Sequence, residues 1–201
     1  MKKFLLTISR EFGCNAREIS RQIASRLNME LHDRDLITKA AERAGINRDE
    51  FADSDGLLDK NVKNVFKQFS FGSSTSFYSE RAVMAQAETI KELAENDGPQ
   101  LFFGRCADYF LRSYPNRLNI FLYAPKEYRI AHMAEAYGLK ESEAARIIKR
   151  IDREKHNYYK YVTGLNRGSR DTKQLMIDVS EFGTEGAVDM VCYAVHQRFG
   201  D

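Results

Sequence analysis

The order of elements at the start of the chain constrains the fold more than any other feature of the sequence. Residues 4–8 form a short aliphatic and β-branched run that stops at Ser9-Arg10-Glu11, as a buried strand does. After a loop, apolar residues recur at the spacing of one helix face, at Ile19, Ile23, Ala24 and Leu27. A second short strand is predicted at 29–31. A strand–loop–helix–strand unit favours a parallel sheet in an α/β fold.

The same alternation returns in the second half of the chain. Apolar runs predict strands at 100–103, 118–123 and 175–179, with helices at 106–113, 125–137, 142–161 and 184–198. The middle of the chain predicts helices at 35–44, around 58–69 and at 79–96, and a Ser- and Gly-rich linker at 70–79. We therefore predict one α/β domain with a parallel sheet of about five strands flanked by helices. Its core would comprise 1–34, 99–138 and 174–201, with helical inserts at 35–98 and 139–173.

The composition agrees with an ordinary globular domain. A chain of 201 residues can bury a sizeable core, and 43% hydrophobic with 30% charged residues is typical of such domains. The first apolar run meets Arg10 and Glu11 too early for a signal peptide, and no apolar stretch reaches the ~20 residues of a membrane span. Three scattered cysteines without a CxxC spacing indicate a reducing, cytoplasmic location, and the isolated histidines argue against structural zinc.

Positive charge is concentrated in one segment. The net charge of +2 is too small to indicate nucleic-acid binding. Between 146 and 173, however, nine basic residues crowd together: Arg146, Lys149, Arg150, Arg153, Lys155, Lys160, Arg167, Arg170 and Lys173. Two interpretations stay open, a solvated helix face or a clamp for a ligand with several negative charges.

The loop after the first strand is a candidate anion site. In a doubly wound sheet, ligands bind beyond the carboxyl ends of the strands. A phosphate-binding loop needs backbone N–H groups turned inward at a helix N-terminus, with a cation beside them. This loop has Gly13, but Ala16-Arg17-Glu18 stands where the Walker pattern has Gly-Lys-Ser/Thr. An ordinary connection with an exposed arginine is the alternative.

Several segments, in chain order, carry a family resemblance. They are Ile8 to Gly13 followed by Arg17-Glu18-Ile19, then Gly104 to Tyr109, then 118–125, 148–153 and 176–180. Together they resemble the cytidylate-kinase-like family of P-loop nucleoside monophosphate kinases over nearly the whole chain, least well in 48–78. The resemblance implies a P-loop kinase sheet in which 35–98 is the acceptor-side insert and 139–173 the lid.

The resemblance implies that the first loop holds the donor phosphates. The residues concerned are Gly13, Cys14, Asn15, Ala16, Arg17 and Glu18. Where this chain has Gly13 to Arg17, the family usually has Gly-Ser-Gly-Gly-Arg, so we expect Asn15 to take the positive φ of the turn. Ala16 adds a Cβ at a place of close approach to phosphate, and Glu18 is the only candidate there for a magnesium ligand.

The resemblance also implies acceptor and lid residues. Asp33, Arg105 and Asp108 would lie on the substrate side; the alternatives are a helix cap for Asp33 and a local ion pair for Asp108. Arg150 and Arg153 lie three apart on the predicted lid helix and so share a face. With Arg17, they would stabilise charge on a transferring phosphoryl group.

The function that the resemblance implies is phosphoryl transfer from ATP, with Mg²⁺, to a nucleoside monophosphate. CMP is the acceptor suggested by the family, and nucleotides are the expected partners. We expect neither a membrane nor nucleic acid as a partner, and a homo-oligomer stays open. The main alternative is a kinase-fold protein that binds a nucleotide or anion without turnover, because the Gly-Lys-Ser/Thr triplet is missing. A basic RNA-binding module is a third interpretation.

Overall fold

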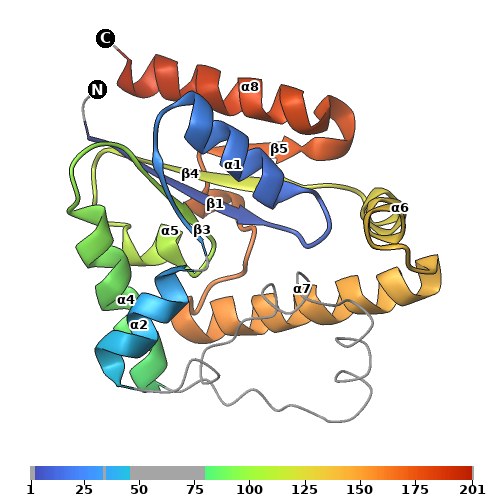
Figure 1. Cartoon of the computed structure of the whole chain (residues 1–201), viewed down its shortest axis with the longest axis horizontal. Helices are drawn as coiled ribbons and strands as arrows, with labels where there is room; N and C mark the ends of the chain where they lie inside the picture. The colour runs from blue at the N-terminus through green and yellow to red at the C-terminus, as the bar shows by residue number, and fades with distance from the viewer. Residues whose placement is uncertain (1–2, 34, 46–79, 201) are drawn as a thin grey trace.

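The computed structural model describes residues 3–33, 35–45 and 80–200, and it has a parallel sheet with helices on both faces (Figure 1). The strands are β1 (Leu5–Arg10), β2 (Glu30–His32), β3 (Gln100–Phe103), β4 (Arg117–Tyr123) and β5 (Leu175–Asp178). The helices are α1 (Ala16–Arg26), α2 (Asp35–Ala44), α4 (Glu80–Ala94), α5 (Ala107–Phe110), α6 (Lys126–Tyr137), α7 (Glu141–Thr163) and α8 (Val179–Phe199), with a 3₁₀ turn at Arg170–Thr172. The α/β prediction is confirmed; the helix predicted at 58–69 and the linker at 70–79 lie outside the described residues.

The order of the strands places the carboxyl ends of β1 and β3 together. The sheet runs β2-β3-β1-β4-β5 and every pairing is parallel. The chain passes from β1 outward to β2, returns through β3, and then crosses β1 to build β4 and β5 on the other side. The connections thus reverse direction between β1 and β3, and a doubly wound sheet binds ligands at such a point.

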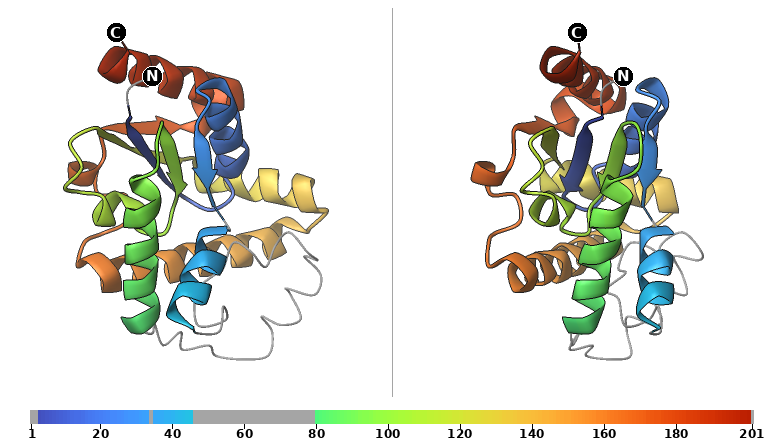
Figure 2. Two further views of the ribbon diagram at one scale, coloured as in Figure 1. Left: turned by 60° about the vertical axis from the view of Figure 1, so that its left-hand side comes forward. Right: turned by 90° about the vertical axis from the view of Figure 1, so that its left-hand side faces the viewer.

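Each strand sends alternate side chains to two different helical layers, because successive residues of a strand point to opposite faces. On β1, Leu6 and Ile8 join the core beneath α1 and α8, together with Ile23 and Val191. Leu5 joins the opposite core, which contains side chains of α4, α5 and α7. Figure 2 shows these layers from two further sides, with α7 crossing beyond the carboxyl ends of the strands. The sheet therefore holds the strand ends between two packed layers, facing α7.

Helix α5 covers only 107–110 of the predicted 106–113, and helices α4 and α8 differ from expectation in other ways. The apolar pattern of the predicted helix at 79–96 would place Met84 on its inward face, but the Met84 side chain is exposed. The inward face of α4 instead carries small residues, Ala82 and Ala85, which pack with the alanines of α2. Helix α8 begins at Val179, earlier than predicted, and is kinked at Gly183, whose φ is 66°. None of the described helices combines the length and apolar character that crossing a membrane requires.

Candidate anion-binding site at the strand ends

The loop between β1 and α1 has a fixed backbone. Gly13 and Asn15 have positive φ angles of 91° and 57°, which confirms the conformation expected for Asn15. A Cβ on Gly13 would come within 3.3 Å of the backbone oxygen of Arg129 on α6, so the loop lies against that helix. On the other side, Asn15 Nδ2 donates a hydrogen bond of 3.0 Å to Thr184 Oγ1 of α8. The loop is thus held between α6 and α8.

Asp152 of α7 binds this loop to two arginines. Its carboxylate accepts the backbone N–H of Phe12 at 2.9 Å, Nη1 of Arg129 at 2.6 Å and Nη2 of Arg167 at 2.8 Å. Arg129 is buried, and it also donates to the backbone oxygens of Phe12 and Ala124, each at 3.0 Å. One carboxylate therefore joins the loop, α6, α7 and the segment after α7.

Arg17 and Glu18 begin α1 but turn in different directions. Arg17 Nε donates to Asp33 Oδ2 at 2.8 Å, and Nη2 lies 3.4 Å from Oδ1. This fork places the guanidinium over the ends of β2 and β3, with its carbon 5.6 Å from the Phe103 ring. The Glu18 carboxylate accepts from Gln22 Nε2 at 3.1 Å, along its own helix. Within the described ranges, no group of three or more His, Cys, Asp or Glu side chains is arranged to hold a metal ion.

Cys14 is buried in the middle of the loop and is an inert thiol. Its Sγ donates to the backbone oxygen of Glu11 at 3.2 Å. Burial raises the pKa of Cys14 to about 12, although the nearby Arg10 opposes that rise. The side chain is therefore neutral at physiological pH, and it fills the loop from within.

Arg10 ends β1 and lies flat on an aromatic ring. Its guanidinium carbon is 3.8 Å from the centre of the Phe103 ring, the last residue of β3. A Cβ added to Gly104 would lie 2.2 Å from Nη1 of Arg10, so any other residue there would displace the guanidinium from this place. Burial lowers the pKa of Arg10 to about 9; Asp33 opposes the change, while Arg105, Arg17 and Arg167 add to it.

Lys155 of α7 faces the same group of charges. Burial, and then Arg10, Arg167 and Arg105, lower the pKa of Lys155 well below its ordinary value, and Asp152 opposes them. We call these five side chains the cationic cluster: Arg10, Arg17, Arg105, Lys155 and Arg167. Among the described residues that act on the pKa values of Arg10 and Lys155, the cations outnumber the carboxylates, which are Asp33 and Asp152. Such an excess favours an anionic ligand.

Asp108, three residues beyond Arg105, belongs to a separate and balanced group. Both Asp108 and Lys173 are buried, with Lys173 Nζ 2.5 Å from Asp108 Oδ2. The hydroxyl of Tyr159 on α7 donates to the same oxygen at 2.9 Å. We call this the Asp108–Lys173 pair; it corresponds to the local ion pair considered from the sequence, with Lys173 as the partner.

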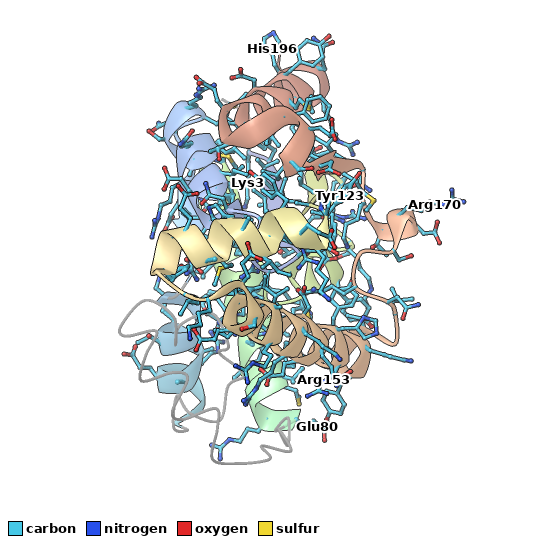
Figure 3. All side chains as sticks on the ribbon, turned by 90° about the vertical axis from the view of Figure 1, so that its right-hand side faces the viewer. Lys3, Glu80, Tyr123, Arg153, Arg170 and His196 are labelled. Atoms are coloured by element: carbon cyan, nitrogen blue, oxygen red, sulfur yellow. The ribbon has the colours of Figure 1, made fainter. Side chains whose placement is uncertain are left out.

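The two arginines predicted for the lid lie away from these contacts. Arg150 Nε pairs with Glu154 Oε1 at 2.8 Å on the same helix. Arg153 is exposed, and in Figure 3 it lies on the lower side of α7, whereas α6 lies above that helix. The α7 residues at the cationic cluster are Lys155, which belongs to it, and Asp152, which lies beside it. These two residues are three apart and share another face of the helix. The catalytic role of Arg150 and Arg153 stays a prediction.

Sequence reasoning missed Arg10, Lys155, Asp152 and Arg167 as site residues. The signals for Lys155 and Arg167 were present in the crowded segment 146–173, which contains both. Arg10 stood at the carboxyl end of the first strand, where ligands bind in such sheets. Asp152 gave no signal of its own among the many charges of α7.

Comparison with known proteins supports this architecture. A solved structure of an uncharacterized protein from Eubacterium ventriosum is 20% identical, covers 97% of this chain and 99% of its own, and has a TM-score of 0.73. The protein TT1252 from Thermus thermophilus is 14% identical, with 99% of both chains covered and a TM-score of 0.56. Shikimate kinase from Acinetobacter baumannii, in complex with shikimate, is 11% identical, with 98% and 96% covered and a TM-score of 0.54. At these identities the likeness establishes the fold alone.

The sequence itself also matches a family. The comparison with curated proteins gives no match. The model of the cytidylate kinase-like family matches residues 5–181, which include the loop, every strand and the whole cationic cluster. With a P-loop kinase fold and a match over most of its length, this chain belongs to the cytidylate kinase-like family.

Proposed function

We propose that this protein transfers the terminal phosphoryl group of ATP to a nucleoside monophosphate, with CMP as the acceptor that family membership suggests. The observation that carries the proposal is the cationic cluster at the point where β1 and β3 end together. Phosphoryl transfer needs little covalent chemistry from the protein, so positioning and charge neutralisation supply most of the catalysis. Several cations gathered at one site are suited to the several negative charges of two phosphate chains.

In this proposal the cluster divides by the elements that supply it. Arg105 and Arg17 bind the acceptor phosphate from the ends of β3 and β2, and Asp33 holds the Arg17 guanidinium in place. The other residues of the loop from Gly13 to Glu18 lie on the donor side. ATP would supply the phosphoryl group, and Mg²⁺ would neutralise part of the charge on its phosphates.

The lid role falls to α7 and the segment after it, within 139–173. Lys155 and Arg167 approach the strand ends from there, and Asp152 orients Arg167. Arg150 and Arg153 are the alternative lid residues that the sequence suggested. A cytoplasmic location is part of the same proposal, and the three free cysteines support it.

Binding without turnover is the second candidate function. It is favoured by Ala16 and Glu18, which put a Cβ and a carboxylate where P-loop kinases have a glycine and a hydroxyl. It is also favoured by Arg17, which pairs with Asp33 at the end of β2. The two candidates share the cationic cluster, and they differ only in whether transfer follows binding.

The test is a panel of nucleoside monophosphates incubated with Mg-ATP, with ADP release and the phosphorylated product both measured. We expect product with one monophosphate, and we expect Arg105→Ala to lower kcat/KM for that acceptor about 10- to 100-fold through loss of a charge-assisted contact. Arg112→Ala is the matched control, because Arg112 is an exposed arginine that stacks on Tyr109 outside the cluster. Absence of any product, with ATP still bound, would favour the second candidate.

A further inference from the structure

The phosphate loop of this chain has no lysine of its own. The residue at the Walker lysine position is Arg17, and its fork is directed to Asp33 at the end of β2. A loop that binds phosphate through backbone N–H groups still needs a cation close to its base. Arg10 ends the strand that enters the loop, so it lies at the base of the loop.

The backbone of Arg10 is fixed by the sheet. Arg10 is in register with Leu122 of β4, and the next residue, Glu11, donates its N–H to the Leu122 oxygen at 2.9 Å. On the other side of β1, the N–H of Gly104 donates to the Ile8 oxygen at 2.9 Å. Arg10 therefore has a rigid base, unlike a cation on a long exposed helix.

The side chain of Arg10 is also restrained. Its guanidinium stacks on the Phe103 ring at 3.8 Å. A guanidinium presents its N–H groups in a rigid planar fork that matches the geometry of a phosphate. An arginine held in this way loses little conformational freedom when it binds an anion.

Gly104 is required by this arrangement. Its φ of +76° would strain any side chain, and a Cβ there would lie 2.2 Å from Nη1 of Arg10, so the guanidinium would have to move away. Gly98 provides a comparison at the other end of β3: its φ is +79°, but a Cβ there would meet nothing within 4 Å. The two glycines share a positive φ, and they differ in whether an added Cβ would contact another side chain.

We propose that Arg10 is a phosphate-binding residue that supplies the fixed cation missing from the loop, and that Gly104 is a positioning residue for its guanidinium. The inference concerns the same site as the proposed function and adds a binding residue to it. The ligand class is an inorganic or nucleoside polyphosphate, since Arg10 lies with Arg17, Arg105 and Arg167 and with Asp33 as the opposing carboxylate. A bound anion would relieve the repulsion among these guanidinium groups.

The test is calorimetric titration of the full chain with inorganic tripolyphosphate at fixed pH and salt. We expect Arg10→Met to weaken binding about 10- to 100-fold, the loss typical of a charge-assisted contact, and Arg10→Lys to weaken it less, since lysine keeps the charge without the fork. Gly104→Ala should weaken binding in the same direction as Arg10→Met. Gly98→Ala, which suffers the same backbone strain, should bind as the wild type does.

Thermal melting of each variant shows whether it is folded. If Arg10→Met does not fold, Arg10→Lys and the pair Gly104→Ala and Gly98→Ala decide the question. Wild-type affinity in the Arg10 variants, equal losses in the two glycine variants, or a wild type that does not bind tripolyphosphate would each overturn the inference. A wild type that binds tripolyphosphate but phosphorylates no monophosphate would refute the proposed function and leave the role of Arg10 measurable.

Discussion

The cationic cluster and the Asp108–Lys173 pair both bury charge at the carboxyl end of β3, but they do so in opposite ways. The pair is balanced, since one lysine faces one carboxylate and both are inaccessible. In the part of the chain that the structure describes, the cluster is unbalanced, because its five cations lie with the carboxylates of Asp33 and Asp152. Only three residues separate Arg105 from Asp108 along the chain. Local charge balance therefore distinguishes side chains that hold the fold from side chains that lower stability until a ligand binds.

The largest expected effect is on the balanced pair. Lys173→Met would leave the Asp108 carboxylate buried without its counter-charge, and we expect the free energy of unfolding to fall by about 3–5 kcal/mol. Lys3→Met is the matched control, because it breaks an exposed pair with Glu95 that is worth at most ~1 kcal/mol. Urea denaturation of both variants measures the difference. Similar losses in the two would show that burial of the pair does not matter.

The second test separates the two sets of lid residues. Arg167 belongs to the cluster and is held by Asp152, whereas Arg153 is exposed on α7. We expect Arg167→Ala to lower kcat about 10²- to 10³-fold, the usual cost of one charge-stabilising donor. Arg153→Ala should stay within a few-fold of the wild type, as measured by steady-state kinetics on the acceptor found in the panel. A reversed order would return the catalytic role to the arginines that the sequence suggested.

The third test asks whether removing a lysine of the cluster raises the free energy of unfolding, whereas removing Lys173 of the balanced pair lowers it. A lysine whose pKa is lowered in the folded state destabilises that state at every pH where the unfolded chain is more protonated, so stability rises with pH towards the ordinary pKa near 10.4. We expect Lys155→Met to stabilise the ligand-free protein by roughly 1 kcal/mol at pH 7 and by less at pH 9. The same variant should bind tripolyphosphate more weakly.

Lys149→Met serves as the control for this sign, because Lys149 is an exposed residue of α7. Its unfolding free energy should stay within about 0.5 kcal/mol of the wild type at both pH values. If Lys155→Met destabilised the ligand-free protein as Lys173→Met does, the two regions would be alike and the comparison would fail.

The smallest expected effect is that the Cys14 thiol does not react with a thiol reagent in the native protein. Cys14 lies in the loop beside the cluster, and burial raises its pKa to about 12. Cys106 is buried as well, whereas Cys192 is half-buried on α8. We expect a thiol reagent such as DTNB to modify Cys192 in the native protein at pH 8, and Cys192→Ser to remove that reaction. Modification of Cys14 on the same timescale would show that the loop opens.

Strands and helices were predictable where the period of apolar residues was clear. The helix at 35–44 and the strand at 100–103 have the predicted bounds, and the turn at Asn15 has its expected φ. The site was less predictable, because spacing along the chain does not give the order of strands. Arg10 reaches Phe103 only because β3 lies beside β1.

The faces of α7 were a second difficulty. Successive residues on a helix point about 100° apart, so neighbours on α7 such as Asp152 and Arg153 meet different surroundings. Several basic residues on one helix therefore suggest the presence of a cationic site without identifying which of them form it. The kink of α8 at Gly183 had no signal beyond the glycine itself.

The three contacts of Asp152 have a consequence for how this site can evolve. A single carboxylate there satisfies Phe12 of the loop, Arg129 of α6 and Arg167 after α7. Substitutions at these positions cannot act independently, because each changes what the shared partner still has to satisfy. A lineage that replaced Asp152 would need compensating changes on elements far apart in sequence. These residues should therefore vary together or not at all, and their history should be marked by epistasis.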